Sequence, residues 1–578
     1  MARSCNPTAA WSESLRVSVP TEESFDLIVV GAGGAGLSAA AVAASLAQRV
    51  LLLEYAPWVG GTTAISGGMV WLPANHKMAE AGLADSLDAA RQYLAATLPA
   101  SADTRMLETF LARGDEALRY LEAHTALRLQ PVLRYPDYYP GRPGSTAGGR
   151  VLEPVPFDAR ALGRDFSRLR PPLPEFMLFG GMMVGRSDIP HLRRATRSLR
   201  SAWHVGRLLL RHAHERLGAA RGTTLCLGNA LAARLFKSAL DLGVDVRTGT
   251  PVRQLCVAGG RVVGVEIEQA GVRRQLHAQR GVILASGGLS HDAALRARFV
   301  PALAGTLTAT LGSAEARSGA SLALAAGGQL SSSPHQQAFW VPASVAPRAD
   351  GSRCVYPHTV TDRSKPGIIA VDQQGLRFTN EAQSYHEFVR AQLRCGAQAV
   401  PAYLVCDRNF LWRYGLGSVK PFALSVERFV GSGSLRRAST LAGLAQALGL
   451  PADAFVATVQ AFNASARQGL DPQFGRGGDI YQRHLGDAAH GPNPCVAPIE
   501  QAPFYAVAVQ PADLGMAAGI VTDDHARVLD SDGTPIAGLY ACGNDMQSVM
   551  NGGYPGPGIT LGPALVFGYL AARHAAAA

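Results

Sequence analysis

Charged residues are scarce in this chain, at 17% of 578 residues, compared with about a quarter in an average globular protein. No run of about 18 uncharged apolar residues is present, so we expect no membrane-spanning helix. The first residues also lack the apolar segment of a secretory signal. The eight cysteines form no C-x-x-C motif and no paired Cys/His spacing, which argues against a metal site and predicts reduced thiols in a cytoplasmic protein. Apolar residues reach 47%, enough for a large core, and this excludes intrinsic disorder.

The basic charge is concentrated in one segment. The formal net charge is +10, and nine arginines but only two carboxylates lie between Arg186 and Arg221. The rest of the chain is therefore close to neutral and has no zinc-finger, RRM or KH signature, so we expect no nucleic-acid partner. The segment at about 186–221 is predicted to be helical, with a broad apolar stripe of Leu192, Leu199, Trp203, Leu210 and Leu217. Two interpretations stay open: a basic amphipathic helix resting on an anionic membrane, or a solvated helix that packs its stripe on the core.

A nucleotide-binding motif begins at Phe25. The run FDLIVV is typical of a buried strand, GAGGAG of a turn and LSAAAVAASLA of a helix, before QRVLLLE returns as a second strand. We expect Gly31 to permit the tight turn, Gly33 to let the backbone approach a pyrophosphate, and Gly36 to let helix and strand pack closely. The intervening Gly34 belongs to the same turn, and Glu54 is placed to accept hydrogen bonds from ribose hydroxyls. The sequence therefore predicts a dinucleotide site.

The kind of dinucleotide is indicated by three further blocks. A loop rich in glycine and hydroxyl groups follows Glu54, an ASGG turn follows a second strand, and GLYACGND lies near the end of the chain. The residues that we assign to the cofactor in these blocks are Gly61, Thr62, Thr63, Ser66, Gly67, Gly68, Ala285, Gly287, Asn544 and Asp545. A simple NAD domain does not need the second loop, whereas a buried FAD needs close backbone contact along its whole length. We therefore predict FAD.

Together the four blocks resemble the flavoprotein family of succinate dehydrogenase, fumarate reductase and 3-ketosteroid Δ1-dehydrogenase. The resemblance implies that Asp545 or Asn544 reaches the ribityl chain, and that the backbone from Ile559 to Leu561 faces the flavin N1/O2 edge. It also implies a Rossmann-like α/β FAD-binding domain with an inserted α+β catalytic domain.

The expected domain boundaries follow from the strand-like runs at both ends of the chain. We expect an N-terminal extension over 1–24, the FAD-binding domain over 25–299 and 511–578, and the catalytic domain over 300–510. Further strands are predicted at Arg261–Gln269, Gly281–Gly287 and Gly538–Gly543, and a last helix at 560–576.

Tyrosines mark the predicted reaction centre. Removing two hydrogens beside a ketone requires a base for the proton and a group that polarises the carbonyl oxygen. In NGGYPGPG, the Tyr554 hydroxyl and the Gly558 N–H are suitable donors, and this block resembles the 3-ketosteroid Δ1-dehydrogenases. That resemblance implies that Tyr385 is the base and that Tyr138 assists it, with Tyr139 as an alternative. The simpler possibilities stay open: Tyr554 as a brace of its loop, and the 138–139 pair as ordinary core or surface residues.

The fumarate reductase branch is less well matched. A dicarboxylate needs His and Arg clamps, yet the H-P-T of that branch is missing around His335, and Asn551-Gly-Gly-Tyr replaces its R-L-G-G. Tyrosines in place of cations favour a neutral hydrophobic ketone, with Phe339, Trp340 and Val341 as candidates to line its cleft.

The sequence thus predicts an FAD-dependent 3-oxosteroid 1-dehydrogenase. The alternatives are a Δ4- or other cyclic-ketone dehydrogenase, and less readily a fumarate or enoate reductase. A lipid-surface binding protein without activity is disfavoured by the complete FAD pattern. His386 stands beside Tyr385 where we expected an acid. No motif encodes the electron acceptor, for which a quinone is one candidate, or the oligomeric state.

Overall fold

The computed structural model describes residues 23–100, 103–269, 271–300, 306–313, 315–331, 337–348 and 350–578. The predicted extension over 1–24 lies outside this range except for its last two residues, which already belong to the first strand, β1 (Glu23–Val30). His335 also lies outside the described residues.

The first of the two large sheets is the predicted nucleotide-binding sheet. Strand β1 pairs in parallel with β2 (Val50–Leu53) and β11 (Val272–Leu284). Its side chains alternate, so that Leu27 and Val29 pack with the helices on one face while Ile28 and Val30 join a second core on the other. The full order is β19 (Arg527–Leu529), β20 (Pro535–Ala541), β10 (Arg261–Gln269), β11, β1, β2 and β8 (Asp245–Arg247), with β9 (Val252–Ala258) paired to β10.

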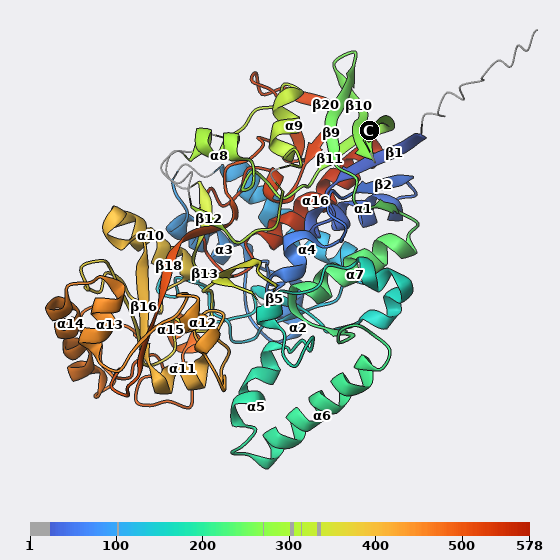
Figure 1. Ribbon diagram of the computed structural model, residues 1–578. Coiled ribbons are helices and arrows are strands. Elements are labelled where there is room, and N and C mark those ends of the chain that lie inside the picture. The colour runs from blue at the N-terminus through green and yellow to red at the C-terminus, as the bar shows by residue number, and fades with distance from the viewer. Residues whose placement is uncertain are drawn as a thin grey trace, which may run out of the picture.

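The helices of this half pack on the Leu27 face. The glycine-rich turn leads directly into α1 (Gly34–Ser45), which lies against the last helix, α16 (Leu561–Ala577). Two longer helices, α4 (Thr104–His124) and α7 (Leu227–Asp241), complete this layer (Figure 1). The parallel sheet with its crossover helix confirms the predicted Rossmann-like fold class.

Short strands and helices lie between these main elements along the chain. The strands are β3 (Val70–Trp71), β4 (Leu129–Pro131) and β5 (Val151–Pro154) in one sheet, and β6 (Phe157–Asp158) and β7 (Thr224–Leu225) in another. The helices are α2 (His76–Glu80), α3 (Leu87–Thr97), α8 (Ala293–Phe299) and α9 (Gly319–Ala325).

The second large sheet belongs to the inserted region. Its order is β14 (Arg353–Pro357), β13 (Ala338–Pro347), β18 (Phe504–Met516), β16 (Ala402–Asp407) and β15 (Ile368–Val371), with β12 (Leu307–Thr308) and β17 (Arg436–Ala438) also paired to β18. Its helices are α10 (Tyr385–Arg394), α11 (Arg408–Tyr414), α12 (Glu427–Gly431), α13 (Leu441–Leu448), α14 (Ala452–Ala466) and α15 (Ile480–Leu485). Residues 511–516 still pair within this sheet, so the chain returns to the first sheet only after Met516. The division into two domains itself stays a prediction.

The basic segment forms two helices, α5 (Ile189–Arg194) and α6 (Leu199–Arg216), which project at the bottom of Figure 1. Of the two open interpretations, packing of the apolar stripe on the core is wrong for four of its five residues. Leu199, Trp203, Leu210 and Leu217 are 91%, 72%, 73% and 86% exposed. A different face of α6 is buried, through Ser201, Leu208 and His212. Among the described residues, no helix combines the length and apolar character needed to cross a bilayer.

Candidate active site

The first glycine turn leaves open space beside only one of its three motif glycines. A Cβ atom on Gly31 would lie 2.3 Å from the Ala285 carbonyl oxygen, and one on Gly36 would lie 1.8 Å from the Gly31 carbonyl oxygen. A Cβ atom on Gly33 would meet nothing within 4 Å. Because α1 begins directly after Gly33, its N-terminal N–H groups and partial positive charge face the same space. This arrangement suits a pyrophosphate.

The second loop packs directly against this turn. Its 3₁₀ turn at Gly61–Ile65 places the Thr63 Oγ1 3.0 Å from the Gly34 N–H, which donates to it. A Cβ atom on Gly61 would lie 3.3 Å from the Gly33 Cα. The two cofactor loops predicted from separate blocks of sequence are therefore adjacent in space.

Other hydroxyls of the second loop stabilise the loop itself or connect it to the inserted region. The Ser66 Oγ accepts a hydrogen bond from the Gly68 N–H at 3.0 Å, and the Thr62 Oγ1 accepts one from the Leu311 N–H at 2.9 Å. A Cβ atom on Gly68 would lie 2.5 Å from the Gly228 nitrogen, whereas Gly67 has nothing within 4 Å. Of this group, Gly67 alone presents open backbone, as Gly33 does.

Two buried carboxylates hold the cofactor turns. Glu54 accepts from the Ala32 N–H at 2.8 Å and from the Ala56 N–H at 3.0 Å, and burial raises its pKa. Asp545 accepts at 2.9 Å from both the Gly288 N–H and the Ser286 Oγ, and burial raises its pKa too. Each carboxylate therefore fixes the backbone beside the expected cofactor path.

The ribityl candidates, Asn544 and Asp545, differ in their surroundings. The Asp545 carboxylate binds the turn that follows Ala285, whereas Asn544 lines a small cavity together with Phe339 and Ile559. A Cβ atom on Gly287 would meet nothing within 4 Å. The open glycines of separate segments, the helix terminus and this cavity fit an extended dinucleotide such as FAD.

Three predicted tyrosines lie together in one buried cluster. The Tyr385 hydroxyl donates to the Tyr554 hydroxyl at 2.7 Å. The Tyr138 ring stacks on Tyr554 with 5.5 Å between centroids and meets Tyr385 edge-on at 5.8 Å. All three side chains are about 95% buried. Segments that are far apart in the sequence thus form one site, as the resemblance implies.

Each tyrosine is positioned by its own backbone. Tyr385 is the first residue of α10, whose N-terminus is capped by the Ser384 hydroxyl as it accepts from the Glu387 N–H at 3.3 Å. Tyr138 donates its N–H to the Pro555 carbonyl at 3.0 Å, so its segment is joined to the loop that carries Tyr554. The preceding Asp137 anchors that segment by accepting from Trp71, Thr146 and Arg150.

Burial dominates the protonation of the cluster. Burial raises the pKa of Tyr385 well above its ordinary value. The neighbouring Tyr554 raises that pKa further, whereas Tyr138 lowers it. Burial raises the pKa of Tyr554 to about 12. His386, where we expected an acid, is neutral because burial lowers its pKa to about 4, and its Nδ1 accepts from the Trp340 N–H at 3.2 Å.

The alternative tyrosine points elsewhere. The Tyr139 hydroxyl donates to the Glu387 carboxylate at 2.8 Å, on another side of α10. Gly558 stands just before α16 with a φ of +98°, and a Cβ atom there would lie 2.4 Å from the Met69 carbonyl oxygen, so only glycine fits. Its N–H makes no hydrogen bond within the described part of the chain.

The predicted cleft residues divide between two faces of β13. Phe339 lies edge-on to Tyr554 with 5.6 Å between ring centroids, and Val341 belongs to the same core. Trp340 points to the opposite face and is part of the other core, so the expectation that it lines the cleft is wrong. Successive side chains of a strand alternate between faces.

Sequence reasoning missed two further tyrosines. The Tyr481 ring lies 4.8 Å from the Tyr138 ring, and the hydroxyls of Tyr135, Tyr138 and Tyr481 are buried without a hydrogen-bond partner among the described residues. Tyr138 and Tyr481 also border a cavity of about 480 Å³ with Glu387 and Asp479 on its wall. Tyr135 lies in the same sequence block as Tyr138 and could have been identified from that block, whereas no motif surrounds Tyr481.

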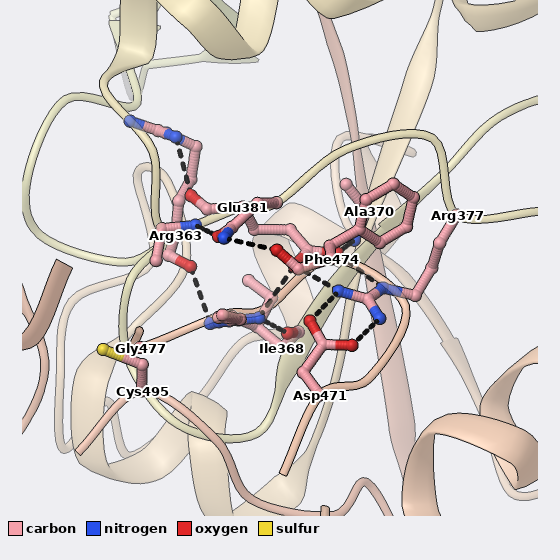
Figure 2. Close-up of polar contacts among 12 residues, drawn as sticks. Arg363, Ile368, Ala370, Arg377, Glu381, Asp471, Phe474, Gly477 and Cys495 are labelled. Carbon is pink, nitrogen blue, oxygen red and sulfur yellow. Dashed lines mark hydrogen bonds and ion pairs between the residues drawn. The ribbon is translucent and has the colours of Figure 1, made fainter. Parts of the chain in front are cut away.

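A buried ionic network supports the segment that leads to Tyr385. Figure 2 shows Arg377 paired with both Glu381 and Asp471, at 2.9 and 2.8 Å. Glu381 also accepts from Arg476 at 3.1 Å and from the Ala370 N–H at 3.0 Å. The segment from Arg377 to Glu381 therefore helps to fix the start of α10 within the inserted region.

The fold and site define the class of protein. A family model described as FAD binding domain matches residues 26–561, and the chain belongs to this family of flavoproteins. The predicted resemblance and the predicted FAD cofactor are confirmed at this level. No three His, Cys, Asp or Glu side chains of the described chain are grouped so as to hold a metal ion.

Particular relatives narrow the class. The chain is 36% identical over 570 residues to a 3-oxosteroid 1-dehydrogenase of Mycolicibacterium smegmatis, covering 96% of this chain and 98% of the relative. It is also 36% identical over 556 residues to a 4-oxocyclohex-2-ene-1-carboxylate 5-dehydrogenase of Sinomonas cyclohexanicum, covering 95% and 93%. The crystal structure of 3-ketosteroid delta1-dehydrogenase from Sterolibacterium denitrificans, in complex with 1,4-androstadiene-3,17-dione, matches with a TM-score of 0.88 and 35% identity, covering 96% of this chain and 100% of that one.

Proposed function

We propose that this chain is an FAD-dependent 3-oxosteroid 1-dehydrogenase, which introduces a C1–C2 double bond into 3-ketosteroids. The observation that carries the proposal is the buried Tyr385–Tyr554 hydrogen bond, formed by the two residues predicted to be base and carbonyl donor. Full-length relatives at 36% identity and a structural neighbour at TM-score 0.88 support the substrate class.

The tyrosines divide the proton chemistry between them. The Tyr554 hydroxyl, 2.7 Å from that of Tyr385, and the Gly558 N–H are the two donors proposed for the ketone oxygen. Polarising the carbonyl acidifies the C2 proton, and Tyr385 as phenolate removes it. Tyr138, whose ring meets Tyr385 edge-on at 5.8 Å and whose hydroxyl has no partner among the described residues, would assist the base by donating a hydrogen bond to the phenolate. When bound along the glycine turns and the Asp545 turn, FAD would supply the two-electron acceptor for the hydride that leaves C1.

The test is an anaerobic titration of the yellow holoprotein with a 3-keto-4-ene steroid. We expect stoichiometric bleaching of the flavin and a 1,4-diene product. An unbleached flavin, or a product without the C1–C2 double bond, contradicts the proposal.

The second candidate is dehydrogenation of a smaller cyclic ketone. The Sinomonas relative, named for a 4-oxocyclohexene carboxylate, is as similar to this chain as the mycobacterial steroid enzyme. The same tyrosine chemistry would serve either ketone. Flavin reduction by 4-oxocyclohex-2-ene-1-carboxylate and by the steroid, measured side by side, separates the two: the steroid proposal requires the higher second-order rate constant for the steroid.

We also propose that α6 rests on an anionic membrane. Its stripe exposes Leu199, Trp203, Leu210 and Leu217, and the arginines on the same helix, Arg200, Arg207, Arg211 and Arg216, are exposed as well. Apolar side chains beside cations are the pattern of an interfacial helix. This position suits a substrate that dissolves in lipid and a quinone as electron acceptor. It is compatible with a cytoplasmic location, which stays a prediction.

Sedimentation with vesicles tests this contact. We expect binding to phosphatidylcholine vesicles that contain phosphatidylglycerol, weaker binding at high salt, and none after the four exposed residues of the stripe are changed to glutamine. The control is the double variant Val257→Gln with Val272→Gln. These two valines are 52% and 53% exposed and lie on the nucleotide-binding sheet, away from α6. Equal binding by the stripe variant and the control contradicts the proposal.

A further inference from the structure

Arg363 is a fully buried arginine near the base that the mechanism above does not use. It lies between β14 and β15 with 0% of its surface exposed. Its guanidinium donates to the carbonyl oxygens of Glu381 and Gln383 at 2.8 and 3.1 Å, and to those of His358 and Thr359 at 2.8 and 3.0 Å. Figure 2 shows the contact to Glu381. The side chain therefore joins its own loop to the segment that ends at Tyr385.

In the described chain, Arg363 differs from the neighbouring buried arginines because no carboxylate lies at ion-pair distance from its guanidinium. Its neighbours Arg377 and Arg476 both pair with Glu381, at 2.9 and 3.1 Å. Within the described chain, the Arg363 guanidinium forms no ion pair within 4.0 Å. The adjacent Asp362 carboxylate is bound to His358 at 2.6 Å and stabilises the charged form of Arg363 only from a longer distance. A buried cation is costly unless something compensates it. Here carbonyl oxygens accept its hydrogen bonds, and Asp362 adds a weaker, more distant attraction.

The Arg363 charge lies near α10 and the tyrosine cluster. The guanidinium carbon lies 5.2 Å from the Phe388 ring, one turn along α10 from Tyr385. Its positive charge lowers the pKa of Tyr481, although burial keeps that pKa high overall. The Tyr481 ring lies 4.8 Å from Tyr138, which in turn meets Tyr385 edge-on at 5.8 Å. Arg363 is therefore connected to the base Tyr385 through the rings of Tyr481 and Tyr138.

We propose that Arg363 is a positioning residue for proton abstraction: it fixes the backbone before Tyr385 and supplies the buried positive charge that a phenolate in this cluster requires. The proposal rests on the function proposed above. It goes beyond that function by assigning the electrostatic support of the base to a residue outside every motif.

The other groups around Tyr385 do not supply this charge. Tyr138, Tyr135, Tyr481 and Tyr554 are neutral phenols, and His386 is neutral. Glu387 and Arg390 pair with each other at 2.8 Å beside Tyr139. Arg186 lies over the Tyr135 ring at 5.6 Å and is bound to Glu153. Asp479 raises the pKa of Tyr481 and so acts against a phenolate.

The experiment compares Arg363→Met, which removes the charge, with Arg363→Lys, which keeps it but loses the planar fork of donors. Two quantities are measured on FAD-loaded protein: the ultraviolet titration of the tyrosines without substrate, and the pH dependence of anaerobic flavin reduction by steroid. We expect Arg363→Met to move the rising limb of the rate profile upward by about one pH unit or more. Arg363→Lys should keep the wild-type midpoint at a lower rate.

A matched control and a second variant keep the test decisive. Arg476→Met removes a buried arginine that does have a carboxylate partner, and it should lower the rate at every pH without moving the midpoint. If Arg363→Met does not fold, Arg363→Gln removes the charge and retains a donor. An unmoved midpoint in the charge-free variant, or the same shift in Arg363→Lys, overturns the proposal. If wild-type flavin is not reduced by steroid, the proposed function fails, while the tyrosine titration still reports on Arg363.

Discussion

The nucleotide site and the tyrosine cluster are built in opposite ways. The nucleotide site is made of backbone. Glycine is required at 31 and 36 because a Cβ atom there would lie only 2.3 and 1.8 Å from a carbonyl oxygen, and the carboxylates of Glu54 and Asp545 bind N–H groups. The tyrosine cluster is made of side chains from four segments that are far apart in the chain. These segments carry Tyr138, Tyr385, Tyr481 and Tyr554, and a 2.7 Å hydrogen bond joins Tyr385 to Tyr554. Damage to the first should abolish the holoprotein, whereas damage to the second should stop the reaction and leave a yellow protein.

The largest effect is expected from Gly36→Ala. The new Cβ would lie 1.8 Å from the Gly31 carbonyl oxygen, so the strand, turn and helix cannot keep their packing. We expect loss of bound FAD or of folded protein, measured by flavin absorbance after gel filtration. Gly206→Ala is the control, because a Cβ there meets nothing within 4 Å. A yellow, active Gly36→Ala protein would contradict the difference drawn between the two sites.

Tyr385→Phe should lower the rate of flavin reduction by about 10²–10⁴-fold, the usual contribution of a general base. The flavin content should match wild type, because no cofactor turn is touched. Tyr139→Phe is the matched control, since its hydroxyl binds Glu387 instead of the cluster, and it should change the rate only a few-fold. If both variants reduce their flavin equally fast, Tyr385 is not the base.

Tyr554→Phe should lower the same rate by about 10²–10³-fold, as expected for loss of one carbonyl donor. The Gly558 N–H would remain as a second donor. Steroid affinity, measured by equilibrium titration with a product analogue, should weaken as well. A variant with normal rate and affinity would reduce Tyr554 to a brace of its loop.

The pH dependence should follow the tyrosine. Burial raises the pKa of Tyr385, so the phenolate fraction, and with it the rate, should rise about tenfold per pH unit below that pKa. Stopped-flow flavin reduction through the alkaline range measures this. A rate that is flat across neutral and alkaline pH would exclude a phenolate base.

The same contrast explains what could be predicted from the sequence. The β1–α1–β2 unit was predictable because its turn, strand period and glycines are local in the chain. Tyr138, Tyr385 and Tyr554 were accessible only through family motifs. Tyr481 and Arg363 have no local signature, because only the tertiary fold brings them to the site.

The exposed face of α6 shows the limit of periodicity. Its leucine stripe indicated an amphipathic helix correctly, but periodicity alone does not say which face meets the core. In the structure, Leu208 is buried while Leu210 is 73% exposed. Similarly, Trp340 faces away from Phe339 because both belong to strand β13, which the sequence analysis did not predict.

The central claim is removal of hydrogen from C1 and C2 beside the ketone that Tyr554 holds. The most direct measurement uses a saturated 3-ketosteroid, which offers both the C1–C2 and the C4–C5 bond, with deuterium at C1. The account predicts slower flavin reduction than with the unlabelled steroid, loss of label from C1 and a 1-ene product. A 4-ene product that keeps the C1 label would contradict it.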